Sequence, residues 1–220
     1  MRAVVLFARS PEREAAAKRM PSAAPLFRAV IAAWLRAAHA HDAMPVIACE
    51  PRDRESLASI APALGRCWIE QRPGAFGTRV ADAVAATFVL GYDAVLLAAI
   101  DAPPSDLGAA FGALDEGRAV IAPARDGGVN FIGLTSPNRA LLEQLAPHRR
   151  DLVALCERHL DRVVVLETTT DVDSPSSLKF ARHEKAWRPY FPVLQLHPAT
   201  PFRSDLPVVT SPLPSRAPPA

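Results

Sequence analysis

Short runs rich in Val, Ile and Leu recur along the chain, separated by longer Ala-rich stretches with the apolar spacing of helices. This alternation is typical of repeated βα units around a mostly parallel sheet that helices cover on both faces. We therefore predict strands at residues 3–8, 45–49, 67–70, 94–100, 119–122, 129–134 and 162–166. The clearest helices are expected at residues 26–40, 76–90, 106–116, 139–145 and 152–160, and a last one begins near Ser174.

Proline sets the expected end of the folded domain. From Trp187 onward, prolines recur at intervals that forbid regular helix and interrupt strand pairing. We therefore expect one domain over residues 1–186 and a Pro-rich tail over residues 187–220, extended and with its last dozen residues disordered. Four aromatic residues of the tail are candidates for packing onto the domain: Trp187, Tyr190, Phe191 and Phe202.

Composition excludes several classes of protein. The net charge of +2, from 25 basic and 23 acidic residues, gives no broad field that would attract nucleic acid or an anionic membrane. The longest apolar runs, such as 94–100, fall far short of the roughly 20 residues of a membrane-spanning helix. The first residues lack the pattern of a signal peptide, and the three cysteines are odd in number and widely spaced. These features predict a cytoplasmic protein with reduced thiols.

Asp101 is the first candidate for a functional residue. It follows the run A-V-L-L-A-A-I, whose continuous apolar character suits a central strand buried on both faces. In open α/β sheets, ligands bind in the crevice outside the carboxyl ends of the strands. Pro103 and Pro104 then stiffen the turn that presents the carboxylate. The alternative is an Asp that merely caps local backbone amides, and the apolar run favours the functional interpretation.

A second acidic site is D-V-D-S-P at residues 171–175. Asp171 and Asp173 can both face one hard cation, since Mg²⁺ and Mn²⁺ prefer oxygen ligands. Equally, Asp173 or Ser174 is a good helix N-cap and Pro175 a good first-turn residue. The two interpretations are compatible.

The segment P-A-R-D-G-G-V-N at residues 123–130 lies between two apolar runs. Its Asp-Gly pair is typical of a tight hairpin, which by itself accounts for Gly127 and Gly128. Asp126 and Asn130 are candidates for side chains that point into a cleft.

The loop after the first strand contains no glycine, because all ten glycines lie at or after Gly65. It therefore forms neither a P-loop nor a dinucleotide-binding fingerprint. It does carry Arg9, Arg13, Lys18 and Arg19. Such side chains can bind a pyrophosphate through charge-assisted hydrogen bonds, although a solvated basic loop is the plain alternative, above all for Arg13.

Five segments, in this order, resemble the motifs of the bacterial DUF2064 family, a branch of the nucleotide-diphospho-sugar transferases. They are F-A-R-S-P at 7–11 with K-R-M at 18–20, Q-R-P-G-A-F-G-T-R at 71–79, I-D-A-P at 100–103, P-A-R-D-G-G-V-N-F-I-G-L at 123–134, and D-V-D-S-P at 171–175. The resemblance covers residues 2–180. It departs from the family where the first loop lacks its glycine, where Ile100 replaces a serine, and where Val129 and Asn130 replace an aromatic pair.

The resemblance implies a GT-A fold, which is a Rossmann-like three-layer α/β/α fold with a mostly parallel central sheet. It implies that Arg9, Lys18, Arg19, Gln71 and Arg79 bind the nucleotide and its phosphates. The implied metal ligands for Mg²⁺ or Mn²⁺ are Asp101 and Asp173, and the implied catalytic carboxylates are Asp126 and Asp173.

The implied activity is metal-dependent glycosyl transfer from a nucleoside-diphosphate sugar to a small-molecule acceptor that the motifs leave open. Two alternatives remain. Guanylyl- and cytidylyltransferases share this architecture and also end in an Asp-x-Asp-x-Pro element. A degenerate, noncatalytic module that binds a nucleotide or a partner protein would explain the lost loop glycine and the Pro-rich tail. The partners expected are thus a nucleotide or nucleotide-sugar donor and an acceptor, with no nucleic acid, no membrane span and the oligomeric state open.

Overall fold

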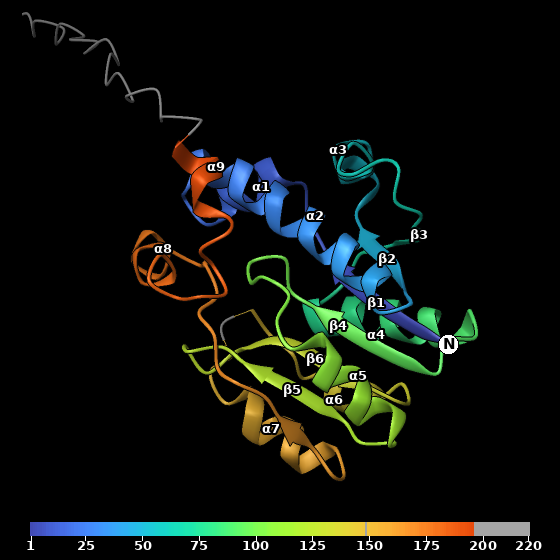
Figure 1. Cartoon of the computed structure of the whole chain (residues 1–220). Helices are drawn as coiled ribbons and strands as arrows, with labels where there is room; N and C mark the ends of the chain where they lie inside the picture. Colours follow the sequence, from blue (N-terminus) through green and yellow to red (C-terminus); the bar gives the residue numbers. More distant parts are fainter. Residues whose placement is uncertain (148, 196–220) are drawn as a thin grey trace, which may run out of the picture.

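A seven-stranded sheet forms the centre of the computed structural model, which describes residues 1–147 and 149–195 (Figure 1). The strands are β1 (Arg2–Phe7), β2 (Ala43–Cys49), β3 (Cys67–Glu70), β4 (Ala94–Ala98), β5 (Val120–Pro123), β6 (Val129–Leu134) and β7 (Val164–Val165). The helices are α1 (Pro11–Ala17), α2 (Ala24–Ala40), α3 (Arg54–Ala58), α4 (Phe76–Val89), α5 (Leu107–Asp115), α6 (Arg139–Leu142), α7 (Leu152–His159), α8 (Pro175–Ala181) and α9 (Phe191–Gln195), with short 3₁₀ turns at Pro21–Ala23 and Pro51–Asp53.

The strand order is β3-β2-β1-β4-β6-β5-β7, and β6 is the one strand of this sheet that runs antiparallel to its neighbours. The chain winds from β1 outward to β2 and β3, and then returns to place β4 on the other side of β1. The direction of winding therefore changes between β1 and β4. Open α/β sheets bind ligands in the crevice at such a switch point, outside the carboxyl ends of the two strands.

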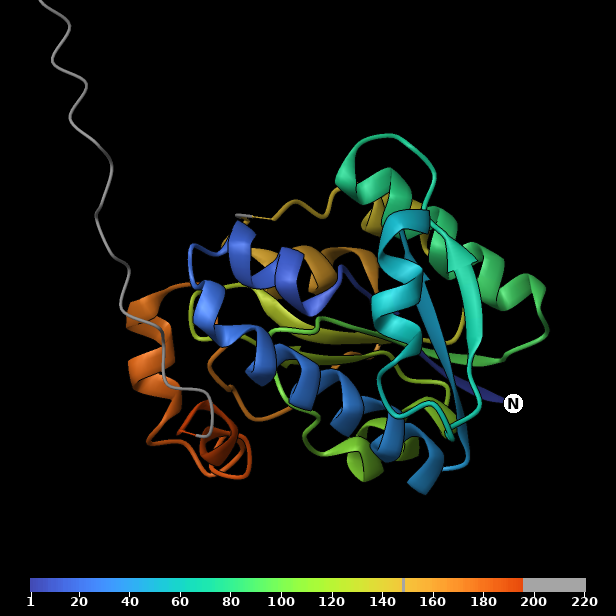
Figure 2. The same ribbon diagram turned by 90° about the horizontal axis from the view of Figure 1, so that it is seen from above.

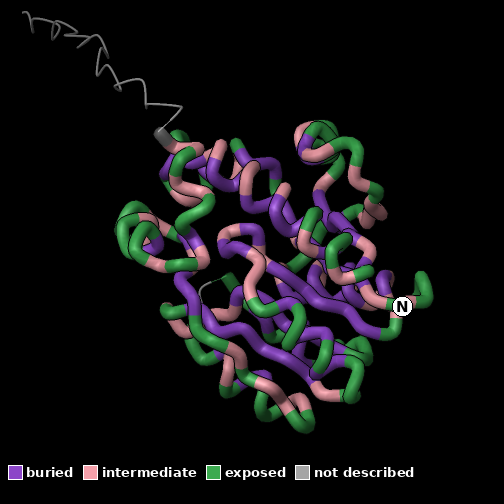
Figure 3. Tube along the Cα trace, viewed as in Figure 1, coloured by how far each residue is buried: buried purple, intermediate pink, exposed green. Residues whose placement is uncertain are grey.

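Helices cover both faces of the sheet, which gives three layers (Figure 2). On one face, α2 and α5 pack through Phe27, Trp34 and Phe111 against residues of β1, β4 and β6. On the other face, α4, α6 and α7 pack through Val84 and Leu155, among others. Buried residues accordingly gather along the central strands and the inner sides of the helices (Figure 3). Continuous burial of β4 on both faces explains why its sequence is apolar without alternation.

The predicted fold class is confirmed, and all seven predicted strands are present. The ends differ by a few residues: β4 ends at Ala98 rather than at residue 100, so Asp101 lies three residues beyond the strand. The predicted hairpin also forms, because β5 and β6 pair antiparallel around Asp126 and Gly127. Ser174 caps α8, and Pro175 is its first residue.

The short helices α1 and α3 were not predicted. The segment after β1 was expected to be a loop, and residues 11–17 form helix α1 instead. Ser10 is its N-cap and accepts a hydrogen bond from the Arg13 amide, while Pro11 occupies the first turn. Both are recognised helix-start signals. Of the basic residues of this segment, Arg13 lies within the helix and Lys18 caps its end.

The expectation that proline excludes helix after Trp187 is wrong for residues 191–195, which form α9. Pro192 lies in the first turn, where its missing N–H would have no partner within the helix. Trp187 is fully buried, and its ring packs against Tyr190 and Phe191. The proposed anchor Phe202 and the last dozen residues lie outside the described part of the chain.

Gly77 supplies a test of how closely the helices on the second face pack. A Cβ atom added to Gly77 would lie 2.3 Å from the carbonyl oxygen of Glu143, at the end of α6. We expect Gly77→Ala to lower the free energy of unfolding by about 1–3 kcal/mol, because the added methyl group meets backbone that cannot rotate away. Urea unfolding measures this. Gly112→Ala in α5 is the control, since nothing lies within 4 Å of its added Cβ; equal stability of the two variants would contradict the close contact.

Candidate functional site

The crevice at the switch point receives side chains from both sides. Arg9 and Ser10 follow β1, and Asp101 follows β4. A third segment joins them, because the Val172 N–H donates a hydrogen bond of 2.8 Å to the Asp101 carbonyl oxygen. The segments that carry Asp101 and Asp171–Asp173 are therefore held together by the backbone itself.

Three carboxylates meet at this junction. Oxygen atoms of Asp101, Asp171 and Asp173 lie within 4.8 Å of one another. Val172 between the two latter residues is fully buried in the core, so the segment is anchored while the flanking carboxylates remain at the crevice. Mg²⁺ and Mn²⁺ prefer hard oxygen ligands. By the chemistry of their donor atoms, these three residues fit a divalent cation.

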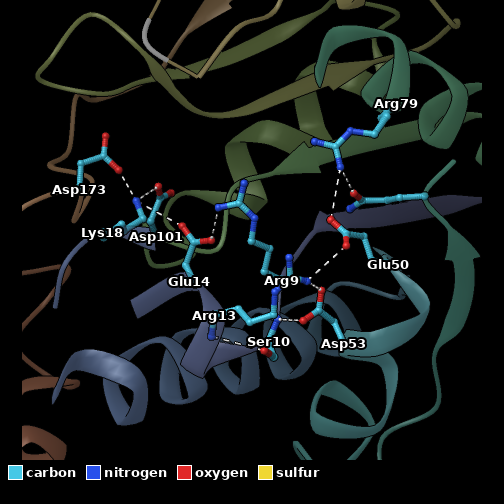
Figure 4. Close-up of polar contacts among 11 residues, drawn as sticks. Arg9, Ser10, Arg13, Glu14, Lys18, Glu50, Asp53, Arg79, Asp101 and Asp173 are labelled. Carbon is cyan, nitrogen blue, oxygen red and sulfur yellow. Dashed lines mark hydrogen bonds and ion pairs between the residues drawn. The ribbon is translucent and has the colours of Figure 1, made fainter. Parts of the chain in front are cut away.

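Lys18 lies in the middle of this group (Figure 4). Its ammonium nitrogen is 2.5 Å from Oδ2 of Asp101, pairs with Oδ1 of Asp173, and is 3.5 Å from Oε1 of Glu14. Glu14 in turn is 3.5 Å from the Arg9 guanidinium. The Lys18 side chain is only 10% exposed. We call Glu14, Lys18, Asp101, Asp171 and Asp173 the carboxylate cluster.

The pKa values in the carboxylate cluster reflect burial and the charges of the neighbouring residues. Burial, with the nearby charges of Asp101 and Asp173, raises the pKa of Asp171 to about 7. Burial also opposes ionisation of Asp173, but the Lys18 ammonium outweighs it and lowers the Asp173 pKa. For Lys18, burial disfavours the charged form, and the carboxylates of Asp101, Asp173 and Glu14 overcome that effect and raise its pKa. Lys18 is therefore cationic, in a cluster whose carboxylates outnumber it.

The other basic residues predicted to bind phosphate have separate environments. Arg13 pairs with Asp53 and with Glu50, away from the carboxylate cluster. Arg19 is exposed, with a φ of 57° in the left-handed region at the end of α1. Arg9 is half-exposed beside Glu14. Of the residues of this segment predicted to bind phosphate, Lys18 thus contacts Asp101, and Arg9 reaches the carboxylate cluster through Glu14.

Asp53 is fully buried and tethers the segment after β1. One of its oxygens accepts a hydrogen bond of 3.0 Å from the Ser10 N–H, and the other pairs with Arg13 (Figure 4). The tether holds the start of α1 against the 3₁₀ turn that follows β2. Sequence reasoning missed Asp53, because an Asp after a strand carries no signal of its distant partner.

The tether predicts a stability loss. Asp53→Ala leaves a buried backbone N–H and the Arg13 guanidinium without their carboxylate, and we expect it to lower the free energy of unfolding by about 2–3 kcal/mol. Urea unfolding checks the value. Asp93→Ala removes a carboxylate that is 81% exposed, and a surface pair of this kind contributes about 1 kcal/mol or less. A similar decrease in the free energy of unfolding in both variants would show that the buried contacts of Asp53 contribute no more than a surface ion pair.

Gln71 and Arg79 line a separate open cavity of about 560 Å³ beside β3. The Gln71 amide donates to the Ala48 carbonyl oxygen and accepts from Arg79 at 2.9 Å. Glu50, 3.8 Å from Arg79, also lines this cavity (Figure 4). The cavity begins at the carboxyl ends of β2 and β3, so it borders the same edge of the sheet as the carboxylate cluster.

Asp126 and Asn130 lie outside the carboxylate cluster. Asp126 pairs with Arg150 and accepts a hydrogen bond from the Gly128 amide. Asn130 is buried, and its amide nitrogen donates to the Thr169 side chain at 2.6 Å. These contacts place the β5–β6 turn beside the segment that leads to Asp171, and the catalytic role of Asp126 stays a prediction.

The family model described as "Uncharacterized protein conserved in bacteria (DUF2064)" matches residues 32–146, more than half of the chain. The chain belongs to the DUF2064 family. The matched part of this DUF2064 chain contains Gln71, Arg79, Asp101 and Asp126, whereas Lys18 and Asp173 lie outside it. Among curated proteins, none matches the sequence.

Solved structures share the fold of this DUF2064 chain. One is a protein from Desulfovibrio desulfuricans G20 inferred to be a nucleotide-diphospho-sugar transferase, with 23% identity, a TM-score of 0.66, and coverage of 90% of this chain and 99% of that one. A 4-diphosphocytidyl-2C-methyl-D-erythritol synthase from Anaerococcus prevotii DSM 20548 has 11% identity, a TM-score of 0.51, and coverage of 84% and 96%. Rv0371c from Mycobacterium tuberculosis, solved with manganese, has 17% identity, a TM-score of 0.51, and coverage of 81% and 95%.

These likenesses establish the nucleotide-diphospho-sugar transferase type of fold for this chain. Within the described residues, no helix has the length and apolar character that crossing a membrane would require.

Proposed function

We propose that this chain binds a nucleoside-diphosphate sugar together with Mg²⁺ or Mn²⁺ and transfers the sugar to a small-molecule acceptor. The observation that carries the proposal is the carboxylate cluster, which lies at the switch point between β1 and β4 where open α/β sheets bind their ligands. Two structural neighbours add support, one inferred to be a nucleotide-diphospho-sugar transferase and one solved with manganese.

The proposed reaction requires that negative charge on the departing diphosphate be neutralised. A divalent cation held by Asp101, Asp171 and Asp173 would, when bound, supply part of the positive charge that neutralises the diphosphate. Arg9 and Lys18 project into the same crevice from the segment after β1, and their cationic groups suit the remaining phosphate oxygens. Gln71 and Arg79 line the neighbouring cavity and would hold the nucleoside side of the donor.

The acceptor hydroxyl needs a base, for which Asp126 and Asp173 are the proposed candidates. Asp173 is ionised and 42% exposed, so it is open to an acceptor. Asp126 is accessible only if it exchanges its ion pair with Arg150 for the acceptor hydroxyl. Asp173 therefore has the simpler path to a proton, provided that its other oxygen is free of the cation.

A nucleotidyltransferase is the second candidate function, favoured by the cytidyl-transferring synthase among the structural neighbours. In that reaction an acceptor phosphate attacks the α-phosphorus of a nucleoside triphosphate and releases pyrophosphate. Glycosyl transfer instead breaks the bond between the sugar and the diphosphate and releases a nucleoside diphosphate.

The leaving group decides between the two functions. Incubation with Mn²⁺ and panels of nucleotide sugars or nucleoside triphosphates, each with mixed small-molecule acceptors, would be followed by chromatography of the products. We expect nucleoside diphosphate from a sugar donor. Pyrophosphate from a triphosphate would support the nucleotidyltransferase. Metal-dependent donor binding without either product would support the noncatalytic binding module.

A further inference from the structure

The Lys18 ammonium contacts carboxylates from three separate parts of the chain. Glu14 belongs to α1, Asp101 follows β4, and Asp173 precedes α8. Each of these carboxylates points an oxygen at the nitrogen (Figure 4). Carboxylate oxygens thus surround the ammonium as they would surround a bound metal cation, whereas a lysine in a solvent-exposed loop would contact mainly water.

We propose that Lys18 is an internal counter-ion that occupies the cation position of the carboxylate cluster and competes with the divalent metal for it. The inference rests on the metal site of the proposed function. It concerns a different property of that site, namely which positive charge holds it in the absence of ligand.

Shared oxygens are the reason for competition. Lys18 uses Oδ2 of Asp101 and Oδ1 of Asp173, and both carboxylates belong to the group whose oxygens lie within 4.8 Å of one another. A divalent ion on these carboxylates would lie within a few ångströms of the ammonium. At such separations two cations repel strongly in a part-buried site. The ammonium must therefore leave the shared oxygens when the metal binds.

The position of Lys18 allows this movement. Its backbone caps the end of α1, with its N–H bonded to Glu14 and Ala16 carbonyl oxygens, so the main chain stays in place. The ammonium is attached through four flexible methylene groups and can swing without unfolding the helix. A donor diphosphate in the same crevice would offer the displaced ammonium new anionic partners.

Binding of metal and donor is coupled as a result. A metal ion that binds alone must break the ion pairs of Lys18 with Asp101 and Asp173, and the ammonium then has no new anionic partner. When a diphosphate binds together with the metal, the Lys18 ammonium can form a new ion pair with its phosphate oxygens. By linkage, each ligand then strengthens the binding of the other. Lys18 accordingly makes the site select a metal–diphosphate pair over free metal.

The test is titration of Mn²⁺ alone, without nucleotide, followed by electron paramagnetic resonance of the free ion. We expect Lys18→Met to bind Mn²⁺ about tenfold more tightly or better, because it retains the length of the side chain and removes the competing charge. Lys18→Arg keeps the charge and should stay close to the parent protein. Arg19→Met removes an equal charge from the adjacent exposed residue, and its affinity should change by about twofold at most.

Each result separates the inference from the proposed function. If the parent binds Mn²⁺ and Lys18→Met binds it equally or more weakly, the counter-ion role is wrong while the metal site stands. If neither protein binds Mn²⁺ in the cluster, the metal site and the inference both fall. Because loss of Lys18 leaves buried carboxylates unpaired, folding is checked by thermal unfolding, and Mn²⁺ should raise the Tm of Lys18→Met more than that of the parent. A smaller rise would overturn the inference even if the variant is destabilised.

Discussion

Asp101→Asn is expected to abolish metal-dependent binding of nucleoside-diphosphate sugars while the fold persists. The substitution retains the shape of the side chain and removes the carboxylate that follows β4 at the switch point. Loss of groups that merely support metal ligands typically weakens metal affinity by about 10- to 100-fold, so loss of a direct ligand should weaken it by about 100-fold or more. Isothermal titration of the donor in the presence of Mn²⁺ measures the effect.

Asp115→Asn is the matched control for this variant. Asp115 also carries a carboxylate paired with a cation, Arg2, but at the opposite end of the sheet. Its replacement should leave donor binding unchanged. Binding that survives Asp101→Asn, or that needs no metal in the parent, would place the ligand elsewhere and contradict the role assigned to Asp101.

Trp187→Ala is expected to lower the free energy of unfolding by about 3–5 kcal/mol, the usual loss for truncating a large buried aromatic residue. Trp187 is fully buried, and its indole N–H donates a hydrogen bond of 2.7 Å to the Thr170 carbonyl oxygen. The N–H and the hydroxyl group of Thr170 both donate hydrogen bonds to the Glu184 carboxylate. The residues after α8 therefore brace the segment that continues into Asp171 and Asp173.

Urea unfolding of Trp187→Ala tests where the folded domain ends. Phe180→Ala is the control, because Phe180 is an aromatic residue of the same region that is 68% exposed, and its loss should change stability by about 0.5 kcal/mol or less. An unfolding free energy of Trp187→Ala equal to that of the parent would instead support a domain that ends at residue 186. We propose that the domain extends at least through α9.

The strands could be predicted because their signal is local. Apolar runs such as residues 94–98 identify a buried strand without reference to any partner, and the order of strands and helices then restricts the sheet to a few topologies. Asp101 followed from the same logic, since a polar residue after a buried strand must emerge at its carboxyl end. The helix-start signal at Ser10 and Pro11 is equally local, but the basic residues of this segment favoured the prediction of a phosphate-binding loop.

The contacts that define the site could not be predicted in the same way. Lys18 and Asp173 are separated by 155 positions, and Ser10 and Asp53 by 43. No local pattern specifies such pairs, because they depend on the path of the sheet and the packing of α1. The resemblance therefore implied Lys18 as a phosphate-binding side chain, and nothing in the sequence predicted that its ammonium would lie among carboxylates of three separate segments.

The carboxylate cluster at the switch point is proposed to hold a divalent cation together with a nucleoside diphosphate. The most direct measurement is anomalous diffraction from crystals grown with Mn²⁺ and a nucleoside-diphosphate sugar. We expect one manganese peak between Asp101 and Asp173, with diphosphate oxygens on the metal and the Lys18 ammonium moved from Asp101 to the phosphates. A nucleotide bound away from this edge of the sheet, or a diphosphate at the cluster without metal and with Lys18 still on Asp101, would contradict it.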